Sequence, residues 1–166
     1  MKNAWQLPIK ERFRLLKELL PTGRVSITNS TDNTMWLINY CMEISRLLDV
    51  NFGLGTSESA FYDPKYFRIV IGQCAEIEEF IIRFCHESSH HIQHVLYGQQ
   101  FELTNFAQML AYEKEACKLS WLVYKLYFKD HISIHYNSFR CYESKEDLAH
   151  LKNKAKQRQA SARKKK

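Results

Sequence analysis

The sequence predicts an α+β domain in which a small antiparallel β unit packs against two long helices. Apolar residues recur every three to four positions over several long segments, which is the spacing of an amphipathic helix. Between these segments, the residues on both sides of Asp63-Pro64 are aromatic and β-branched, which is typical of two strands joined by a turn. The predicted order is therefore helices, a small β unit, and two long helices.

The composition fits one domain with a substantial core. The chain has 166 residues, of which 45% are hydrophobic and only three are proline. No apolar run reaches the roughly 18 residues needed to cross a bilayer, so we expect no membrane contact. The first residues lack the apolar stretch of a secretory signal. We therefore expect a cytoplasmic protein.

The basic character of the chain lies at its C-terminal end. The formal net charge is +6, but residues 152–166 hold eight Lys and Arg and no acidic residue, which leaves −2 for the rest. We expect one domain over residues 1–151, with residues 1–32 as an N-terminal helical extension, followed by a basic, disordered tail. Because the tail lacks aromatic side chains, it offers weak nucleic-acid contact through phosphates without base stacking.

The cysteines predict neither a disulfide framework nor a cysteine-rich zinc site. Their number is odd, and no two of them have CxxC spacing. Buried or idle thiols in a reducing compartment are the expectation. The five residues are Cys41, Cys74, Cys85, Cys117 and Cys141.

Two helices are predicted before the β unit. A proline opens the first of them, residues 9–20, and a proline and a glycine end it. Thr31 or Asp32 offers an N-cap for the second helix, residues 35–50.

The β unit is predicted as a hairpin with strands over residues 58–63 and 66–72. From Glu76 the spacing becomes helical again and continues to about Tyr97, where Gly98 is a natural stop.

A second long helix is predicted over residues 106–128, with Asn105 as its N-cap. Residues 131–136 are expected to form a short strand or extended segment. Residues 143–158 are expected to form a polar helix that frays into the tail.

The first long helix contains the motif HESSH, which begins at His86 and ends at His90. Residues four apart share a helical face, so both imidazoles can reach one metal ion, and zinc accepts two such nitrogens. Glu87 lies one residue further round the helix, where it can act as general base toward a zinc-activated water. The alternative is a solvated histidine-rich face, since His91 and His94 lie nearby.

A catalytic zinc needs a third protein ligand. A histidine six residues after His90 is excluded because that position is Leu96. A straight helix cannot direct His94 at the same ion as both motif histidines. A carboxylate from the next long helix remains, and the candidates are Glu113 and Glu115.

The neighbours of Glu113 favour it over Glu115. All four residues three and four positions away from Glu113 are apolar, so its carboxylate is expected in the buried stripe, where a cation would offset the cost of burial. Glu115 has mixed neighbours and is expected to be more exposed. The two side chains are about 200° apart around the helix, so both cannot bind one ion. Glu115 stays open as the alternative ligand.

These motifs resemble those of the gluzincin metallopeptidases. HESSHHIQ on one helix, followed by YEKEACKLSW on the next, is similar to the minimal gluzincins and the ImmA/IrrE type over roughly residues 33–128. The resemblance implies a zincin-like fold, with a hairpin directly before the HExxH helix and a Glu-x-x-Ala element after it. Carried over, the zinc ligands are His86, His90 and Glu113. Glu87 is then the general base in the hydrolysis of peptide bonds.

The chain departs from that family at Cys117, where Asn or Asp usually orients a zinc-binding histidine. No oxyanion-stabilising residue can be assigned, although Tyr97, Tyr112 and His94 lie near the motifs. The favoured hypothesis is a zinc peptidase with protein or peptide substrates. A catalytically weak, metal-binding regulatory protein of the same fold and a nucleic-acid-associated protein that uses the basic tail stay open.

Overall fold

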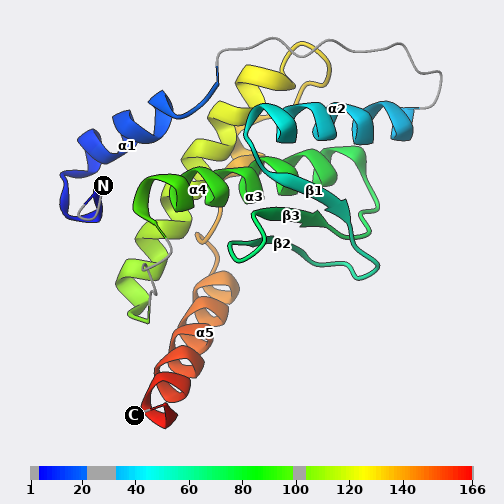
Figure 1. Ribbon diagram of the computed structural model, residues 1–166. Helices are drawn as coiled ribbons and strands as arrows, with labels where there is room; N and C mark the ends of the chain where they lie inside the picture. Colours follow the sequence, from blue (N-terminus) through cyan, green and yellow to red (C-terminus); the bar gives the residue numbers. More distant parts are fainter. Residues whose placement is uncertain (1–3, 22–32, 99–103, 166) are drawn as a thin grey trace.

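The computed structural model describes residues 4–21, 33–98 and 104–165 (Figure 1). Five α-helices, two short 3-10 helices and three strands make up these residues, so the expected α+β class is confirmed. The helices are η1 (Ala4–Gln6), α1 (Ile9–Glu18), α2 (Asn33–Leu47), α3 (Ile77–Tyr97), α4 (Phe106–Tyr127), η2 (Tyr136–Phe139) and α5 (Lys145–Lys164). The strands are β1 (Asn51–Leu54), β2 (Ala60–Asp63) and β3 (Arg68–Ile71).

The sheet has the strand order β1-β3-β2. Strands β2 and β3 form the predicted antiparallel hairpin. Strand β1 pairs parallel to β3, so the sheet is mixed and the expectation of a purely antiparallel unit is wrong. Strand β1 is only four residues long, contains Gly53 and has no alternation of buried and exposed positions, so its sequence carries no strand signal.

Helix α3 lies at the centre of the molecule, between the sheet and α4 (Figure 1). The fully buried ring of Phe84 links these layers, with centroids 5.6 Å from Phe52 on β1 and 6.0 Å from Phe128 after α4. Aromatic pairs in such edge-to-face arrangements add stability beyond the area that they bury. The apolar stripe predicted for α3 is therefore the main core-forming face.

Small side chains line the contact between α3 and α4. Ser89 and Ser120 face each other across it, with their hydroxyl oxygens 3.4 Å apart. Each of these hydroxyls also donates to the backbone carbonyl four residues earlier, which satisfies it inside the core. Because short side chains let two helices approach closely, longer side chains elsewhere along the same contact can reach across it and meet.

Two predicted helix ends, those at Asn105 and Gly98, are confirmed. Asn105 caps α4 by accepting hydrogen bonds from two backbone amides of the first turn. Gly98 ends α3 with a φ of 79°, a left-handed conformation that favours glycine. The N-cap candidates Thr31 and Asp32 lie outside the described residues.

The described part of residues 1–32 is helical and packs into the domain. Leu16 on α1 is completely buried and belongs to the main core. Arg12, one turn earlier, is only 7% exposed. Helix α1 contacts both α3 and α4, so this segment completes the domain.

Residues 131–136 form no strand, so of the two alternatives expected there only the extended segment remains, over residues 132–135. Tyr124 holds this segment by donating its hydroxyl to the Ile132 carbonyl and accepting from the Ile134 amide. The expected disordered tail is helical, because α5 continues to Lys164. Its first half is anchored by Leu151 and Ala155, which are buried against Met109 of α4. The basic charge of residues 152–166 therefore does not mark where the folded domain ends.

Among the described helices, none is both long enough and apolar enough to cross a membrane.

Candidate metal centre

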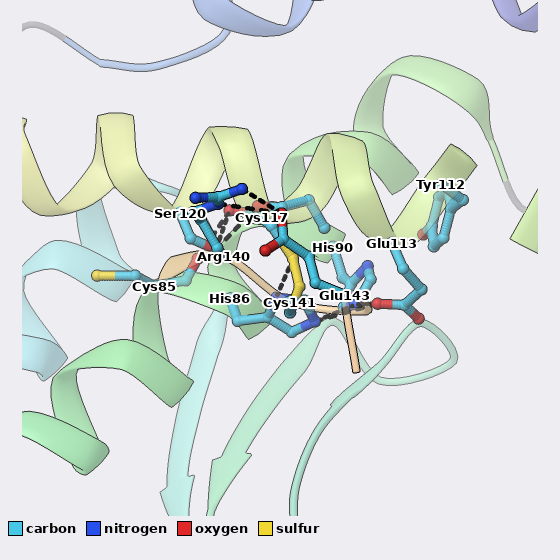
Figure 2. Close-up of a disulfide and its surroundings, with 12 residues drawn as sticks. Cys85, His86, His90, Tyr112, Glu113, Cys117, Ser120, Arg140, Cys141 and Glu143 are labelled. Carbon is cyan, nitrogen blue, oxygen red and sulfur yellow. Dashed lines mark hydrogen bonds and ion pairs between the residues drawn. A yellow bond between two sulfur atoms is a disulfide. The ribbon is translucent and has the colours of Figure 1, made fainter. Parts of the chain in front are cut away.

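His86, His90 and Glu113 meet between α3 and α4, and Figure 2 shows their polar atoms directed at one another. The two Nε2 atoms are 3.1 Å apart. The Oε2 atom of Glu113 lies 3.2 Å from His86 Nε2 and 3.3 Å from His90 Nε2. The structure therefore brings together the three residues that the sequence singled out.

The spacing of these donors matches what a zinc ion requires. Zinc binds nitrogen and carboxylate oxygen at about 2.0–2.2 Å, and the donors of a tetrahedral site then lie about 3.3–3.5 Å from one another. The observed separations of 3.1 to 3.3 Å are close to this range. Two imidazoles with one carboxylate also form the donor set of a catalytic zinc, which keeps one position open. The residues fit the metal.

Glu113 and His90 shift the pKa of each other. Burial disfavours both charged forms, but the adjacent carboxylate of Glu113 raises the pKa of His90 to about 9. Burial likewise opposes ionisation of Glu113, yet His90 and His86 hold its pKa well below the ordinary value. The carboxylate is ionised at neutral pH and can bind a cation.

The second nitrogen of His90 is fixed by Gln93. The Nδ1 atom of His90 lies 2.9 Å from the Gln93 side-chain oxygen. The amide nitrogen of Gln93, which is fully buried, donates to the Tyr112 carbonyl and to Glu115, both at 3.0 Å. The Gln93 oxygen therefore faces His90, and Nδ1–H donates to it. Nε2 is therefore the nitrogen of His90 that can give up its proton and bind a metal.

Glu115 does not belong to the metal centre, and its expected exposure is wrong. The residue is only 6% exposed. Its carboxylate accepts hydrogen bonds from Arg12 Nε at 3.1 Å and from the Tyr97 hydroxyl at 2.6 Å. The neighbours of Glu115 on α4 could not reveal this, because the cation that balances it comes from α1, 103 residues earlier.

Glu87 lies beside the three donors without being one of them. It is 8% exposed and lines a cavity of about 400 Å³ together with His86, His90 and Glu113. Helices α3, α4 and α5 and strand β2 all contribute to the walls. The remaining lining residues are Ala60, Phe61, Tyr62, Pro64, Gln93, His94, Tyr97, Gly98, Met109, Tyr112, Tyr142, Lys154 and Arg158.

The candidates for oxyanion stabilisation have different surroundings. The Tyr97 hydroxyl donates to Glu115, and His94 Nδ1 lies 2.7 Å from the Tyr62 hydroxyl. The Tyr112 ring stacks on His90 at 5.1 Å. Sequence reasoning missed Tyr142, which also lines the cavity and interacts with Glu113. Burial raises the pKa of Tyr142, so its hydroxyl stays protonated and can donate a hydrogen bond.

Cys117 and Cys141 form a disulfide beside His86 (Figure 2), so the expectation of five unpaired thiols is wrong. The pair joins α4 to the segment after η2, with Cα atoms 6.4 Å apart, and no spacing rule predicts a bond across 24 residues. The Cys117 sulfur lies 4.0 Å from His86 Nδ1, where sulfur is only a weak acceptor. Cys41, Cys74 and Cys85 are unpaired.

Comparison with known proteins adds no relative: no protein-family model, curated protein or solved structure matches this chain.

Proposed function

We propose that the protein is a zinc-dependent peptidase. The observation that carries the proposal is the convergence of His86, His90 and Glu113 at mutual distances of 3.1 to 3.3 Å, with Glu87 in the same cavity. Bound zinc would supply a Lewis acid that polarises a carbonyl and acidifies water. The combination of a three-donor site and a neighbouring carboxylate is what hydrolysis requires and what a purely structural zinc site lacks.

Glu87 is the proposed general base. It stands next to His86 in the chain but outside the donor set, so its carboxylate remains available for a proton. In the proposed reaction it takes a proton from the attacking water and delivers it to the leaving amine nitrogen. Tyr112 and Tyr142 are the candidate hydrogen-bond donors to the developing oxyanion, because both line the cavity and burial raises the pKa of both.

Strand β2 supports peptides as the substrate class. Within the described residues it pairs only with β3, so its other edge has unpaired backbone groups. Three of its residues, Ala60, Phe61 and Tyr62, line the cavity that contains the three donors. An extended peptide can add to such an edge through backbone hydrogen bonds, which would bring its amide bonds to the metal centre.

The replacement Glu87→Gln tests the proposal. It should keep zinc and the fold but lower peptide hydrolysis by about 10²- to 10⁴-fold, because an amide cannot accept the proton. Zinc-loaded protein, chelator-treated protein and the variant would be compared on a quenched fluorescent peptide library. Glu79→Gln, on the same helix but outside the cavity, is the matched control. Equal hydrolysis by wild type and Glu87→Gln would contradict the proposal.

A metal-binding regulatory protein is the second candidate, and the surroundings of His86 favour it. Whereas His90 has a strong acceptor in Gln93 at 2.9 Å, the described residues offer His86 Nδ1 only the Cys117 sulfur at 4.0 Å. A less firmly oriented ligand weakens metal binding and catalysis. Stoichiometric zinc without hydrolysis of any peptide would support this candidate. The cytoplasmic location stays a proposal, and the Cys117–Cys141 disulfide is unusual for a reducing compartment.

A further inference from the structure

A second group of metal-binding side chains, Cys117, Cys141 and His86, lies directly beside the first (Figure 2). One donor atom from each residue, two sulfurs and a ring nitrogen, lies within 4.8 Å of the others. The sulfur of Cys117 is 4.0 Å from Nδ1 of His86. The proposed reaction uses neither the two sulfurs nor this nitrogen. Because the thiolate is the form of cysteine that binds metals, this group can hold an ion only after its disulfide is reduced.

The spacing of the three donors suits zinc once the disulfide is open. Zinc binds thiolate sulfur at about 2.3 Å and imidazole nitrogen at about 2.0–2.1 Å, so sulfur and nitrogen donors of a tetrahedral site lie about 3.6 Å apart. The observed 4.0 Å is close to this separation. The two sulfurs must move apart to about 3.8 Å, which their Cα atoms, 6.4 Å apart, permit. Two thiolates and one imidazole, with water in the fourth position, are an established ligand set for zinc.

Packing holds the two cysteines together without the disulfide. Cys117 lies within α4, and the segment around Cys141 is anchored to the same helix on both sides. Before Cys141, the ring of Phe139 is 4% exposed and lies 5.0 Å from the Tyr124 ring of α4. After it, Leu151 of α5 is 1% exposed in a cluster that includes α4. The two thiols should therefore stay side by side after reduction.

A second cavity gives access to this group. Cys141 and His86 line a cavity of about 260 Å³. A dithiol reductant can therefore reach the disulfide, and a metal ion can reach the donors. In the reduction the S–S bond breaks, each sulfur gains one electron and one proton, and the dithiol is oxidised to its own disulfide. The two thiol protons pass to solvent when the thiolates bind the metal.

His86 serves one of the two sites at a time, because a neutral imidazole binds a metal through one nitrogen and carries its proton on the other. Binding at Nδ1 keeps the proton on Nε2, which faces Oε2 of Glu113 at 3.2 Å. Glu113 then accepts a hydrogen bond from Nε2–H and orients the ring, as carboxylates commonly do for metal-binding histidines. Binding at Nε2 instead makes Glu113 a fellow ligand in the first site. The same contact thus supports either site.

We propose that reduction of the Cys117–Cys141 disulfide creates a second metal site, formed by the two thiolates and Nδ1 of His86, which takes His86 from the first site. The inference goes beyond the proposed function and requires no hydrolysis. Zinc and softer metal ions are the fitting cations, because thiolate is a soft ligand. While the disulfide is closed, His86 stays with His90 and Glu113.

Cobalt(II) tests the second site, because thiolate ligands give it a sulfur-to-metal charge-transfer absorption that nitrogen and oxygen ligands do not. The protein would be titrated with cobalt in its oxidised form, and again after reduction with dithiothreitol and removal of the reductant under argon. The reduced protein should show the absorption with one cobalt per chain, and the oxidised protein should not show it. Reduced Cys141→Ser should bind cobalt more than about 10-fold more weakly, because a ligand contributes more than the groups that orient it.

Cys74→Ser is the matched control, because Cys74 is a partly exposed, unpaired thiol that does not belong to the group. Reduced Cys74→Ser should keep the absorption and the affinity of wild type. Losses of equal size in Cys74→Ser and Cys141→Ser would overturn the proposed site. Reduced wild type without the absorption would also overturn it, whether the disulfide stays closed or the chain unfolds on reduction. Thiol counting and far-UV circular dichroism record these two states.

His90→Ala separates failure of this inference from failure of the proposed function. The variant removes a ligand of the first site and none of the second. Reduced His90→Ala should therefore keep the charge-transfer absorption, even if the oxidised wild type neither binds zinc nor hydrolyses a peptide. Its loss in His90→Ala would contradict an independent thiolate site. Binding of two cobalt ions by each reduced wild-type chain would contradict the competition for His86.

Discussion

Glu113 and Glu115 stand two residues apart on α4, and both are buried, but they face different groups. Glu113 faces the Nε2 atoms of two histidines, whereas Glu115 accepts hydrogen bonds from the Arg12 guanidinium, the Gln93 amide and the Tyr97 hydroxyl. A buried carboxylate needs a partner that balances its charge. Burial therefore does not distinguish a metal ligand from a structural carboxylate; the groups opposite the carboxylate do.

The two carboxylates also act on the same imidazole. Glu113 contacts Nε2 of His90 directly, at 3.3 Å, while Glu115 holds the Gln93 amide whose oxygen accepts from Nδ1. Arg12 in turn fixes Glu115. One carboxylate thus belongs to the proposed ligand set, and the other supports the group that orients a ligand. Replacing Glu113 should therefore mainly affect metal binding, whereas replacing Glu115 should mainly affect stability.

Glu113→Ala should have the largest effect on metal binding. Loss of a ligand should lower zinc affinity by more than the roughly 10- to 100-fold typical of changes to groups that only orient a ligand. Competition against a chromophoric chelator measures this affinity. Zinc that stays bound in Glu113→Ala but is lost from Glu115→Ala would reverse the assignment of the two carboxylates.

Glu115→Ala should instead have the largest effect on stability. It leaves the 7% exposed Arg12 buried without its carboxylate, and breaking such a pair costs about 3–5 kcal/mol. Urea unfolding of the metal-free protein measures the loss. The double variant Arg12→Met/Glu115→Leu should recover much of it, because an apolar pair of similar size needs no balancing charge. A double variant as unstable as Glu115→Ala would show that the charge of Arg12 does not account for the loss, because the Gln93 amide and the Tyr97 hydroxyl lose their acceptor in both variants.

Gln93→Leu should lower zinc affinity by about 10- to 100-fold, since His90 would lose the acceptor that orients it. The variant also leaves Glu115 and the Tyr112 carbonyl without a donor, so stability must be measured alongside affinity. Ser88→Ala is the control, because Ser88 is equally buried on α3 but, among the residues that the structure describes, bonds only to the Phe84 carbonyl. An unchanged affinity in folded Gln93→Leu would mean that the Gln93 contact does not orient His90 for metal binding.

The same comparison explains what could be predicted from the sequence. His86, His90 and Glu113 were found because their signals are local: two histidines one turn apart and a carboxylate among apolar neighbours on its own helix. The surroundings of Glu115 were not found, because Arg12 lies on α1 and no periodicity links residues 103 positions apart. The Cys117–Cys141 pair was missed for the same reason.

The errors in the fold have the same origin. The long helices were predicted because repeated spacing extends over many residues, and the hairpin because aromatic and β-branched residues flank a turn at Asp63-Pro64. Strand β1 was missed because its four residues have no such turn next to them, and its partner β3 lies beyond the next strand in the chain. Helix α5 was shortened because the high charge of its second half concealed the anchoring contacts of Leu151 and Ala155.

The last prediction concerns the titration of His90, and it separates the two carboxylates without any metal. In metal-free wild type, Glu113 raises the pKa of His90 from the ordinary 6.5 to about 9 against the effect of burial. Glu113→Gln removes that charge, so the pKa should fall, because burial lowers it and only Glu87 and Gln93 still raise it. Glu115→Gln should leave the pKa raised, because Glu115 reaches His90 only through Gln93. NMR titration of the His90 ring protons measures this pKa in wild type, in Glu113→Gln and in Glu115→Gln.

The sign of the linked stability follows from these shifts. A raised His90 pKa contributes stability that is fully present below pH 6.5 and is lost as the pH rises through about 9. The lowered pKa of Glu113 contributes above its ordinary value of 4.5, and this contribution is lost as the pH falls further. Metal-free wild type should therefore gain most from the pair between about pH 4.5 and 6.5, and Glu113→Gln should lack this dependence. An equal change of the His90 titration in Glu115→Gln would mean that the two carboxylates act on His90 alike, against the contacts that distinguish them.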